Sequence, residues 1–225
     1  MDAAHWAYGK NVPEEDVTII KNGILTESFR KNTAIRNTYR KALRLEGKYV
    51  VGHIGRMVPQ KNHEFLIDIF GEISRKKKNA QLVLIGDGPL IEKIKEKGKY
   101  FGLEEKITFL GLRRDVNKIM QAFDVFVFPS IFEGLGIVTI ESQAASIPTI
   151  CSEFVPSDVD VSNFVMHLSL NDSAAYWAEK IIKFGEKDLQ EDGAEAVKKA
   201  GFDILEVTQK MQEFYLEHWS QNYEQ

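Results

Sequence analysis

Two glutamates in the stretch PSIFEGLGIVTIES, residues 129–142, have side chains and a spacing that could bind a ligand. Seven residues separate Glu133 from Glu141, glycines loosen the segment after the first, and the second lies in an otherwise apolar run. Charged side chains are rarely buried without a partner. The sequence therefore indicates that Glu141 has a partner supplied from elsewhere.

Two cations could contribute to the same ligand site. Arg56 and Lys61 lie on one short segment, GRMVPQKNH, which we expect to follow a strand. Cations opposite a glycine-loosened helix N-terminus would form a pyrophosphate site, since free backbone N–H groups and the helix dipole favour anions. At helical rise plus a short extended loop, Glu133 and Glu141 would lie roughly 10 Å apart. Such a gap suits a diphosphate flanked by two hydroxyl-rich groups, as in a nucleotide-sugar.

The surrounding residues follow an alternating pattern that begins near residue 49. Short β-branched or aromatic runs, typical of buried strands, alternate with amphipathic stretches typical of helices. Strands are predicted at 49–55, 81–86, 106–111, 124–130 and 148–151, and helices at 62–78, 90–102, 115–123 and 136–145. This order predicts an α/β fold with a Rossmann-like doubly wound parallel sheet, right-handed crossovers and helices on both faces. Ligands of such sheets bind beyond the carboxyl ends of the strands.

The flanks of this pattern differ from its centre. Residues 1–45 form an N-terminal segment and linker, with a turn signal at Asn22-Gly23 and a basic surface helix within 30–45. After Asn171-Asp172-Ser173, which can cap a helix, the chain is predicted helical to its end, with breaks near glycines 185 and 201. We therefore divide the chain into residues 1–45, a nucleotide-sugar-binding domain at 46–184, and C-terminal helices at 185–225.

Composition excludes several classes of protein. The 225 residues are 44% hydrophobic and 28% charged, as in an ordinary globular protein, and the formal net charge of −4 gives no reason to expect nucleic acid as a partner. A single cysteine, Cys151, rules out an intrachain disulfide framework and fits a reducing compartment. The N-terminus lacks the apolar segment of a signal peptide, and no apolar run is long enough to span a bilayer. The expected location is the cytoplasm.

Several motifs together resemble one enzyme family. These are GRMVPQKN, LVLIGDGP, ITFLG, DVFVFPSIFEGLGIVTIESQAASIPTI and the N-terminal KNGI. They resemble the C-terminal, donor-binding domain of a family-4 retaining glycosyltransferase of GT-B fold. VVGHIGRMVPQKNHEFLIDIF and HLSLNDSAAYWAEKI are similar to bacterial capsular and exopolysaccharide members in particular. The resemblance covers about residues 18–184, and the combination of motifs is specific where no single motif would be.

The resemblance implies roles for individual residues. Arg56 and Lys61 match the pair that holds the donor diphosphate and stabilises the leaving group. Glu133 matches the carboxylate that meets the transferred sugar, so these three residues would be catalytic. The backbone that meets the sugar and phosphate matches Gly134, Leu135, Gly136 and Ile137.

The nucleoside end of the donor is assigned in the same way. Glu141 matches the residue that accepts hydrogen bonds from ribose hydroxyls, so its expected partner is the ligand. The backbone near Leu112 and Arg113 matches the part that contacts the nucleobase edge. The family needs no metal and no cofactor, and a UDP-sugar is the expected donor substrate.

Two positions depart from the family pattern. Ser146 stands where the family has a glycine, which we expect to affect the end of a helix more than chemistry. Leu25 replaces the acid of the usual N-G-[IV]-D, so that loop receives no role. The resemblance also implies an acceptor-binding N-terminal domain, of which we expect this sequence to contain only the end, because residues 1–20 alone resemble it. The chain is therefore expected to be a fragment that is inactive alone.

Other candidate groups have simpler interpretations. GDGP at 86–89 is first a turn, and Asp158 and Asp160 form a D-x-D pair in a loop, which we do not assign to a metal. His53 lies within a strand and is predicted to be a packed core residue, with a smaller chance of facing the donor. Cys151 has no basic neighbour in sequence and is expected to be an inert apolar residue.

The sequence thus predicts a donor domain that binds a nucleotide-diphospho-sugar for retaining hexose transfer in capsular or exopolysaccharide biosynthesis. Its expected partners are the missing acceptor domain, a lipid-linked or saccharide acceptor, and the inner face of the membrane through peripheral association. A non-catalytic sugar-nucleotide-binding module would use the same binding residues and is the main alternative. A dinucleotide-binding oxidoreductase is disfavoured because the first strand-to-helix turn lacks G-x-G-x-x-G. The last helix, around 203–219, should leave apolar positions partly exposed.

Overall fold

The computed structural model describes residues 7, 9, 11, 13 and 17–223, with side-chain burial up to residue 217. The chain forms two compact units, residues 25–200 and a second unit composed of residues 1–24 with residues 201–225. The larger unit contains the sheet, and also the helices that flank it in sequence at residues 26–42 and 193–199. The three-part division at residues 45 and 184 stays a prediction.

A parallel sheet of six strands forms the centre of the larger unit. Its strands are β1 (Tyr49–Ile54), β2 (Ala80–Ile85), β3 (Ile107–Phe109), β4 (Val125–Phe128), β5 (Thr149–Ser152) and β6 (Val165–Leu168). All are parallel, in the order β3-β2-β1-β4-β5-β6, which is the order of a doubly wound fold. The sequence predicted the first five strands. It missed β6, a short edge strand with three half-buried residues out of four and therefore without a continuous apolar signal.

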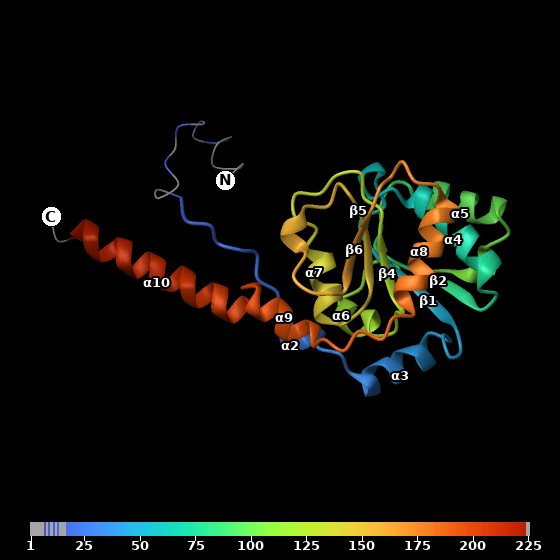
Figure 1. The fold of residues 1–225 in the computed structure, drawn as a ribbon, viewed down its shortest axis with the longest axis horizontal. Coiled ribbons are helices and arrows are strands. Elements are labelled where there is room, and N and C mark those ends of the chain that lie inside the picture. Colours follow the sequence, from blue (N-terminus) through green and yellow to red (C-terminus); the bar gives the residue numbers. More distant parts are fainter. Residues whose placement is uncertain (1–6, 8, 10, 12, 14–16, 224–225) are drawn as a thin grey trace. The chain divides into compact units, whose positions relative to one another are not determined.

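Helices cover both faces of this sheet. They are α2 (Thr26–Phe29), α3 (Thr33–Ala42), α4 (His63–Lys76), α5 (Ile91–Tyr100), α6 (Val116–Met120), α7 (Ile137–Ala144), α8 (Ala174–Gly185) and α9 (Gly193–Lys199), with short 3-10 turns at Pro59–Lys61, Glu104–Lys106 and Ser157–Val159. Figure 1 shows α4, α5 and α8 on one side of the sheet and α6 and α7 on the other. The predicted α/β class and doubly wound sheet are therefore confirmed.

The strands are buried because both faces are covered. Residues of β1, β2 and β4 are almost wholly buried, and α4 and α8 pack over them through Leu66, Phe70 and Trp177. Full burial of one such side chain stabilises the fold by about 1.5–3 kcal/mol. Gly52 is required in β1, because a Cβ there would lie 2.0 Å from the Phe123 ring. The sheet is thus a rigid support for the loops that leave its carboxyl edge.

Two serines lie at helix termini, as the sequence indicates: Ser173 at the start of α8 and Ser146 just after the end of α7. Ser173 accepts a hydrogen bond from the Tyr176 N–H and caps α8. Ser146 ends α7 with φ 55°, the left-handed conformation that glycine adopts more easily, and its hydroxyl accepts from the Gly193 N–H. The serine therefore carries out the glycine's helix-ending role at a conformational cost.

The smaller unit joins an extended segment to the last helix, α10 (Ile204–Tyr223). Ile24 exchanges backbone hydrogen bonds with Phe202 and Ile204, each 2.8 Å. The expected turn at residues 22–23 does not form, since Gly23 lies against the Ile204 backbone and the chain continues extended. The predicted partial exposure of this helix is found at Leu205, Met211 and Tyr215, whereas Ile204 and Phe214 are half-buried and Val207 is buried; the Trp219 side chain lies outside the described residues.

Within the described part of the chain, no helix combines the length and the apolar character needed to cross a bilayer.

Candidate functional site

The carboxyl ends of β1 and β4 define the site. These strands are neighbours, yet the chain leaves β1 toward β2 and β4 toward β5, on opposite sides. Ligands bind at such a switch point because the loops diverge there and leave a crevice. The two loops are held together by Gln60, whose carbonyl accepts from the Ile131 N–H at 2.8 Å and whose amide donates to the Phe132 carbonyl at 2.7 Å.

An ion pair joins the two loops at their centre. The Lys61 Nζ lies 2.5 Å from Glu133 Oε1, and both side chains are largely buried, 18% and 7% exposed. The same ammonium lies 4.7 Å from the centroid of the Phe128 ring, a cation–π contact. The structure therefore brings together two predicted site residues that are 72 positions apart in sequence.

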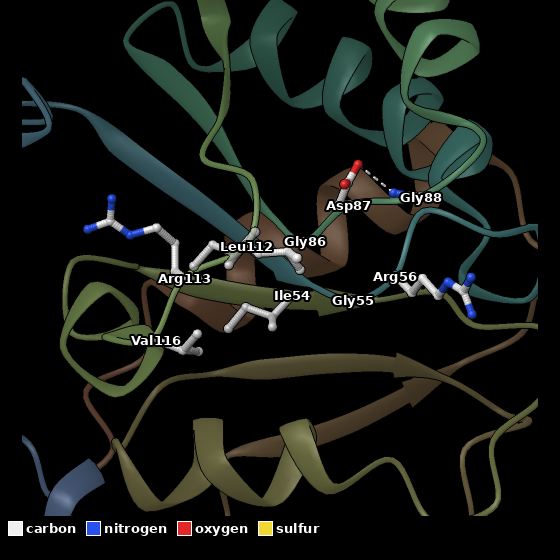
Figure 2. Close-up of a pocket in the computed structure, with 10 residues that line it drawn as sticks. Ile54, Gly55, Arg56, Gly86, Asp87, Gly88, Leu112, Arg113 and Val116 are labelled. Atoms are coloured by element: carbon white, nitrogen blue, oxygen red, sulfur yellow. Dashed lines mark hydrogen bonds between the residues drawn. The ribbon is translucent and has the colours of Figure 1, made fainter.

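A cavity of about 490 Å³ opens over the carboxyl ends of β1 and β2 and the loop that follows β3. It is lined by Ile54, Gly55, Arg56, Ile85, Gly86, Asp87, Gly88, Leu112, Arg113 and Val116. Figure 2 shows Arg56 and Arg113 on opposite sides of it, with Ile54 and Leu112 between them. Three predicted site residues thus line one cavity, whose apolar centre has the size of a small-molecule pocket.

Glycine is required where the loop after β2 meets the loop after β1. A Cβ on Gly86 would lie 2.1 Å from the Gly55 carbonyl oxygen, and one on Gly88 would lie 2.5 Å from the Met57 carbonyl oxygen. Both glycines also have positive φ, 133° and 159°. The backbone of the GDGP segment therefore packs closely against the loop after β1 and fixes one wall of the cavity. The Asp87 side chain stabilises the segment by accepting a hydrogen bond from the Gly88 N–H.

Glu141 is placed as the sequence suggested, half-buried in α7. It has no hydrogen bond or ion pair to any side chain among the described residues, and burial raises the pKa of its carboxyl to about 7. Gly136, with φ 78°, directly precedes the first residue of this helix, Ile137, and no side chain caps the first turn. Its free N–H groups and dipole favour an anion at this end.

Not every predicted residue is brought to one place. Neither glutamate lines the cavity, which holds the Arg56, Leu112 and Arg113 part of the predicted set. Arg56 is exposed, while Arg113 forms a two-point pair with Asp115 at 2.9 and 2.8 Å. This pairing holds the pKa of the Asp115 carboxyl down, at about 2, chiefly through the hydrogen bond from Arg113.

Two residues near the site were missed in the sequence. Gln60 ties the loops together, and His63 lies buried at the first turn of α4, against the predicted core residue His53. His53 is fully buried, as predicted. A histidine two positions after Lys61 was visible in the sequence, but only the fold shows that it is buried and what it packs against.

The remaining candidates do not form a site. Asp160 pairs with His167 at 2.7 Å, and the His167 ring lies 3.6 Å from the Cys151 sulfur, but burial raises the pKa of that thiol. Cys151 is fully buried, as an inert apolar residue should be. In the described part of the chain, no group of three or more His, Cys, Asp or Glu could hold a metal ion.

Comparison with known proteins identifies the family. Residues 48–186 match the model of the group 1 glycosyl transferases. The chain is 35% identical over 185 residues to EpsF of Bacillus subtilis (strain 168), named as a glycosyltransferase, covering 81% of this chain and 48% of that protein. It is 25% identical over 214 residues to the UDP-Gal:alpha-D-GlcNAc-diphosphoundecaprenol alpha-1,3-galactosyltransferase of Escherichia coli, covering 89% of this chain and 54% of that one. The chain therefore spans about half the length of these relatives.

Solved structures agree on the fold. Anabaena HepE, solved with UDP and glucose, superposes with a TM-score of 0.75 at 20% identity, over 95% of this chain and 60% of that one. Sucrose-phosphate synthase of Thermosynechococcus elongatus gives 0.78 at 20% identity, over 97% and 56%. At these identities the likeness establishes the GT-B-type domain fold alone. The match of residues 48–186 to the family model shows that this chain belongs to the group 1 glycosyltransferases.

Proposed function

We propose that the chain binds a nucleotide-diphospho-sugar, with UDP as the nucleotide, and contributes the donor half of a retaining hexosyltransferase. Glu141 is the observation that carries this proposal. Its carboxylate is mostly buried, has no protein partner in the described structure, and lies in the helix that starts at the switch point. Ribose hydroxyls are donors that such an acceptor would bind.

The donor diphosphate would lie between Arg56, Lys61 and the uncapped start of α7. Lys61 is held by Glu133 in the free protein, so a diphosphate would compete for an ammonium that is already in position. The leaving diphosphate gains negative charge during transfer, and fixed cations stabilise that charge. The backbone of residues 134–137 would meet the phosphate and sugar, and the cavity beside Leu112 and Arg113 would take the base. No residue in this proposal needs a metal.

Names of relatives support the choice of substrate and pathway. The Escherichia coli relative is named for UDP-Gal and for a diphosphoundecaprenol acceptor, and HepE was solved with UDP. A Mycobacterium tuberculosis relative, 32% identical over 147 residues, is instead named for GDP-mannose, so the test must compare bases. We extend the proposal to a lipid-linked acceptor and to capsular or exopolysaccharide synthesis, with the acceptor site in a second domain.

Calorimetric titration of the chain with UDP, GDP and uridine tests the proposal. We expect UDP to bind, and Arg56→Ala and Lys61→Ala to weaken UDP by about 10–100-fold, the value of a charge-assisted hydrogen bond, with little effect on uridine. Lys183→Ala, an exposed lysine of α8, is the matched control. Equal losses for UDP and uridine would show that the two cations only support the fold, and tighter binding of GDP would correct the base.

A parallel assay addresses catalysis. Radiolabelled UDP-glucose and UDP-galactose are incubated with the chain and a membrane-lipid extract. We expect binding without transfer, because positioning of donor and acceptor together can contribute effective molarities above about 10⁵ M and the chain spans half of its relatives. Efficient transfer would place the acceptor site within these 225 residues. A full-length enzyme that binds donor but transfers to no acceptor would favour the non-catalytic alternative.

A further inference from the structure

Two buried histidines flank the loop that follows β1. His53 in β1 is fully buried, and His63, the first residue of α4, is 2% exposed. Their rings meet edge to face, with centroids 4.5 Å apart and an interplanar angle of 75°. The His53 ring also stacks on Phe128 at 5.7 Å. Both imidazoles therefore lie in mostly aromatic and aliphatic surroundings.

The hydrogen bond of His53 fixes its tautomer. Its Nδ1 lies 2.8 Å from the Val127 carbonyl oxygen, which can only accept, so Nδ1 carries the hydrogen and Nε2 has a lone pair. β1 and β4 pair through Val51 and Gly52 and then separate, so the side chain of His53 takes a carbonyl beyond the last paired residues. The residue thus bridges the two strands at the point where they diverge.

Three ring nitrogens of this pair have no partner. They are Nε2 of His53 and both nitrogens of His63; among the described residues, the hydroxyl of Ser130 is the one other buried side-chain polar atom in this condition. Ser130 lies two residues after the end of β4. Burial of an unpaired polar group is unfavourable, and an apolar ring of similar size would avoid that penalty. Packing alone does not explain why imidazoles occupy these positions.

Lys61 rests on the same residues. A Cβ on Gly55 would lie 3.2 Å from Nε2 of His53 and 3.4 Å from Cγ of Lys61, so the imidazole and the lysine stem both border the side of Gly55 on which a side chain would stand. Phe128 contacts both the His53 ring and the Lys61 ammonium. Burial, together with the nearby Lys61 charge, lowers the pKa of His63 to about 4 and that of His53 well below its usual value. Both rings are therefore uncharged near neutral pH and do not repel the ammonium.

We propose that His53 and His63 are positioning residues for the donor diphosphate. They form an uncharged polar floor under Gly55 that holds Lys61 where it pairs with Glu133 and receives the phosphate. The lone pair of His53 gives this floor a negative pole on the side of Gly55, against which the Lys61 stem packs, and an apolar ring would lack it. The inference rests on the proposed function, because it assigns Lys61 to the diphosphate.

The test separates support of Lys61 from support of the fold. His63→Phe keeps the ring and its edge contact and removes two unpaired nitrogens, so it should raise Tm by about 2–4 °C. The same variant should weaken UDP about tenfold and leave uridine within twofold. Tyr49→Phe is the control, because it removes another buried polar atom from β1, at the amino end of that strand. It should leave the ratio of UDP affinity to uridine affinity unchanged.

A second variant provides an independent measurement. His53→Asn can retain the donor to Val127 while removing the Nε2 lone pair, and it should also lower UDP affinity selectively. If either folded variant binds UDP as the unmodified chain does, or loses UDP and uridine equally, the pair only packs and the inference is wrong. Failure of the unmodified chain to bind UDP would overturn the proposed function itself, and this inference with it.

Discussion

The parallel strands begin at one side of the sheet, the amino edge, and end at the other, the carboxyl edge. These two edges differ in how their polar side chains are hydrogen-bonded. At the amino edge, Asp124 accepts from Arg36 at 2.5 Å, from Arg40 at 3.0 Å and from the Val50 N–H at 2.7 Å. Beside it, the Gln121 amide donates to the Phe29 carbonyl and accepts from the Asn32 N–H. Every polar group in this cluster has a partner, so the cluster stabilises the fold and has no need of a ligand.

At the carboxyl edge the same sheet leaves polar groups unsatisfied. Glu141 has no partner in the described structure, and three ring nitrogens of His53 and His63 have none. Ionisation follows this difference, because burial raises the pKa of the Glu141 carboxyl and lowers that of the His63 imidazole. The unpaired polar groups make the carboxyl edge less stable than the amino edge. Such a loss of stability is expected where a ligand completes the site.

The largest effect on stability is expected from a substitution in the cluster at the amino edge, where every polar group has a partner. Asp124→Ala removes the carboxylate shared by two partly buried guanidinium groups, which keep their bonds to backbone carbonyls, and leaves the Val50 N–H without its partner. The free energy of unfolding should therefore fall by about 3–4 kcal/mol. Urea denaturation measures this loss, and UDP affinity of the folded variant should be unchanged. Glu72→Ala, which removes an exposed pair with Arg75, is the control and should change stability by less than about 0.5 kcal/mol. Equal effects of the two changes would remove the contrast between the edges.

A pH series tests the buried imidazole. The pKa of His63 is about 4 in the folded protein and 6.5 in the unfolded chain, so the unfolded chain binds the extra proton. Above pH 6.5 both states are neutral at this position. As pH falls from 6.5 toward 4, the unfolded chain takes up the proton and the free energy of unfolding falls by roughly 3 kcal/mol. Glu141 acts in the opposite direction, since its folded pKa is the higher one. We therefore compare the chain with His63→Phe, and parallel pH curves for the two would contradict the expectation.

The smallest effect on stability is expected at Glu141, where a substitution tests whether the buried carboxyl is unsatisfied. Glu141→Gln resembles the protonated acid, so it should stabilise the free protein by about 1–2 kcal/mol at pH 8. This advantage should fade as pH drops through 7 toward 4.5, where the wild-type carboxyl takes up its proton. UDP binding should weaken by about 1–3 kcal/mol. Glu92→Gln, an exposed helical change, should do neither; a variant that gains no stability at pH 8 would show that Glu141 is satisfied after all.

Much of the fold was determined by the sequence alone. Apolar runs buried on both faces predicted β1 to β5, and amphipathic periods predicted α4 to α7, because local hydrophobic patterns suffice where burial is complete. The half-buried edge strand β6 lacked such a pattern. The isolated carboxylate of Glu141 was also visible in the sequence, since its neighbours are apolar and it lies within one helix.

Only the tertiary structure decided which distant residues meet. The pairing of Lys61 with Glu133 across 72 positions depends on β1 and β4 being neighbours, which strand order fixes and local sequence does not. The cavity shared by Arg56 and Leu112 depends on the close packing of two glycine-containing loops. The sequence placed His53 in the core, but the missing partner of its Nε2 is a property of all the surfaces packed around it. Such a property exists only after the chain has folded.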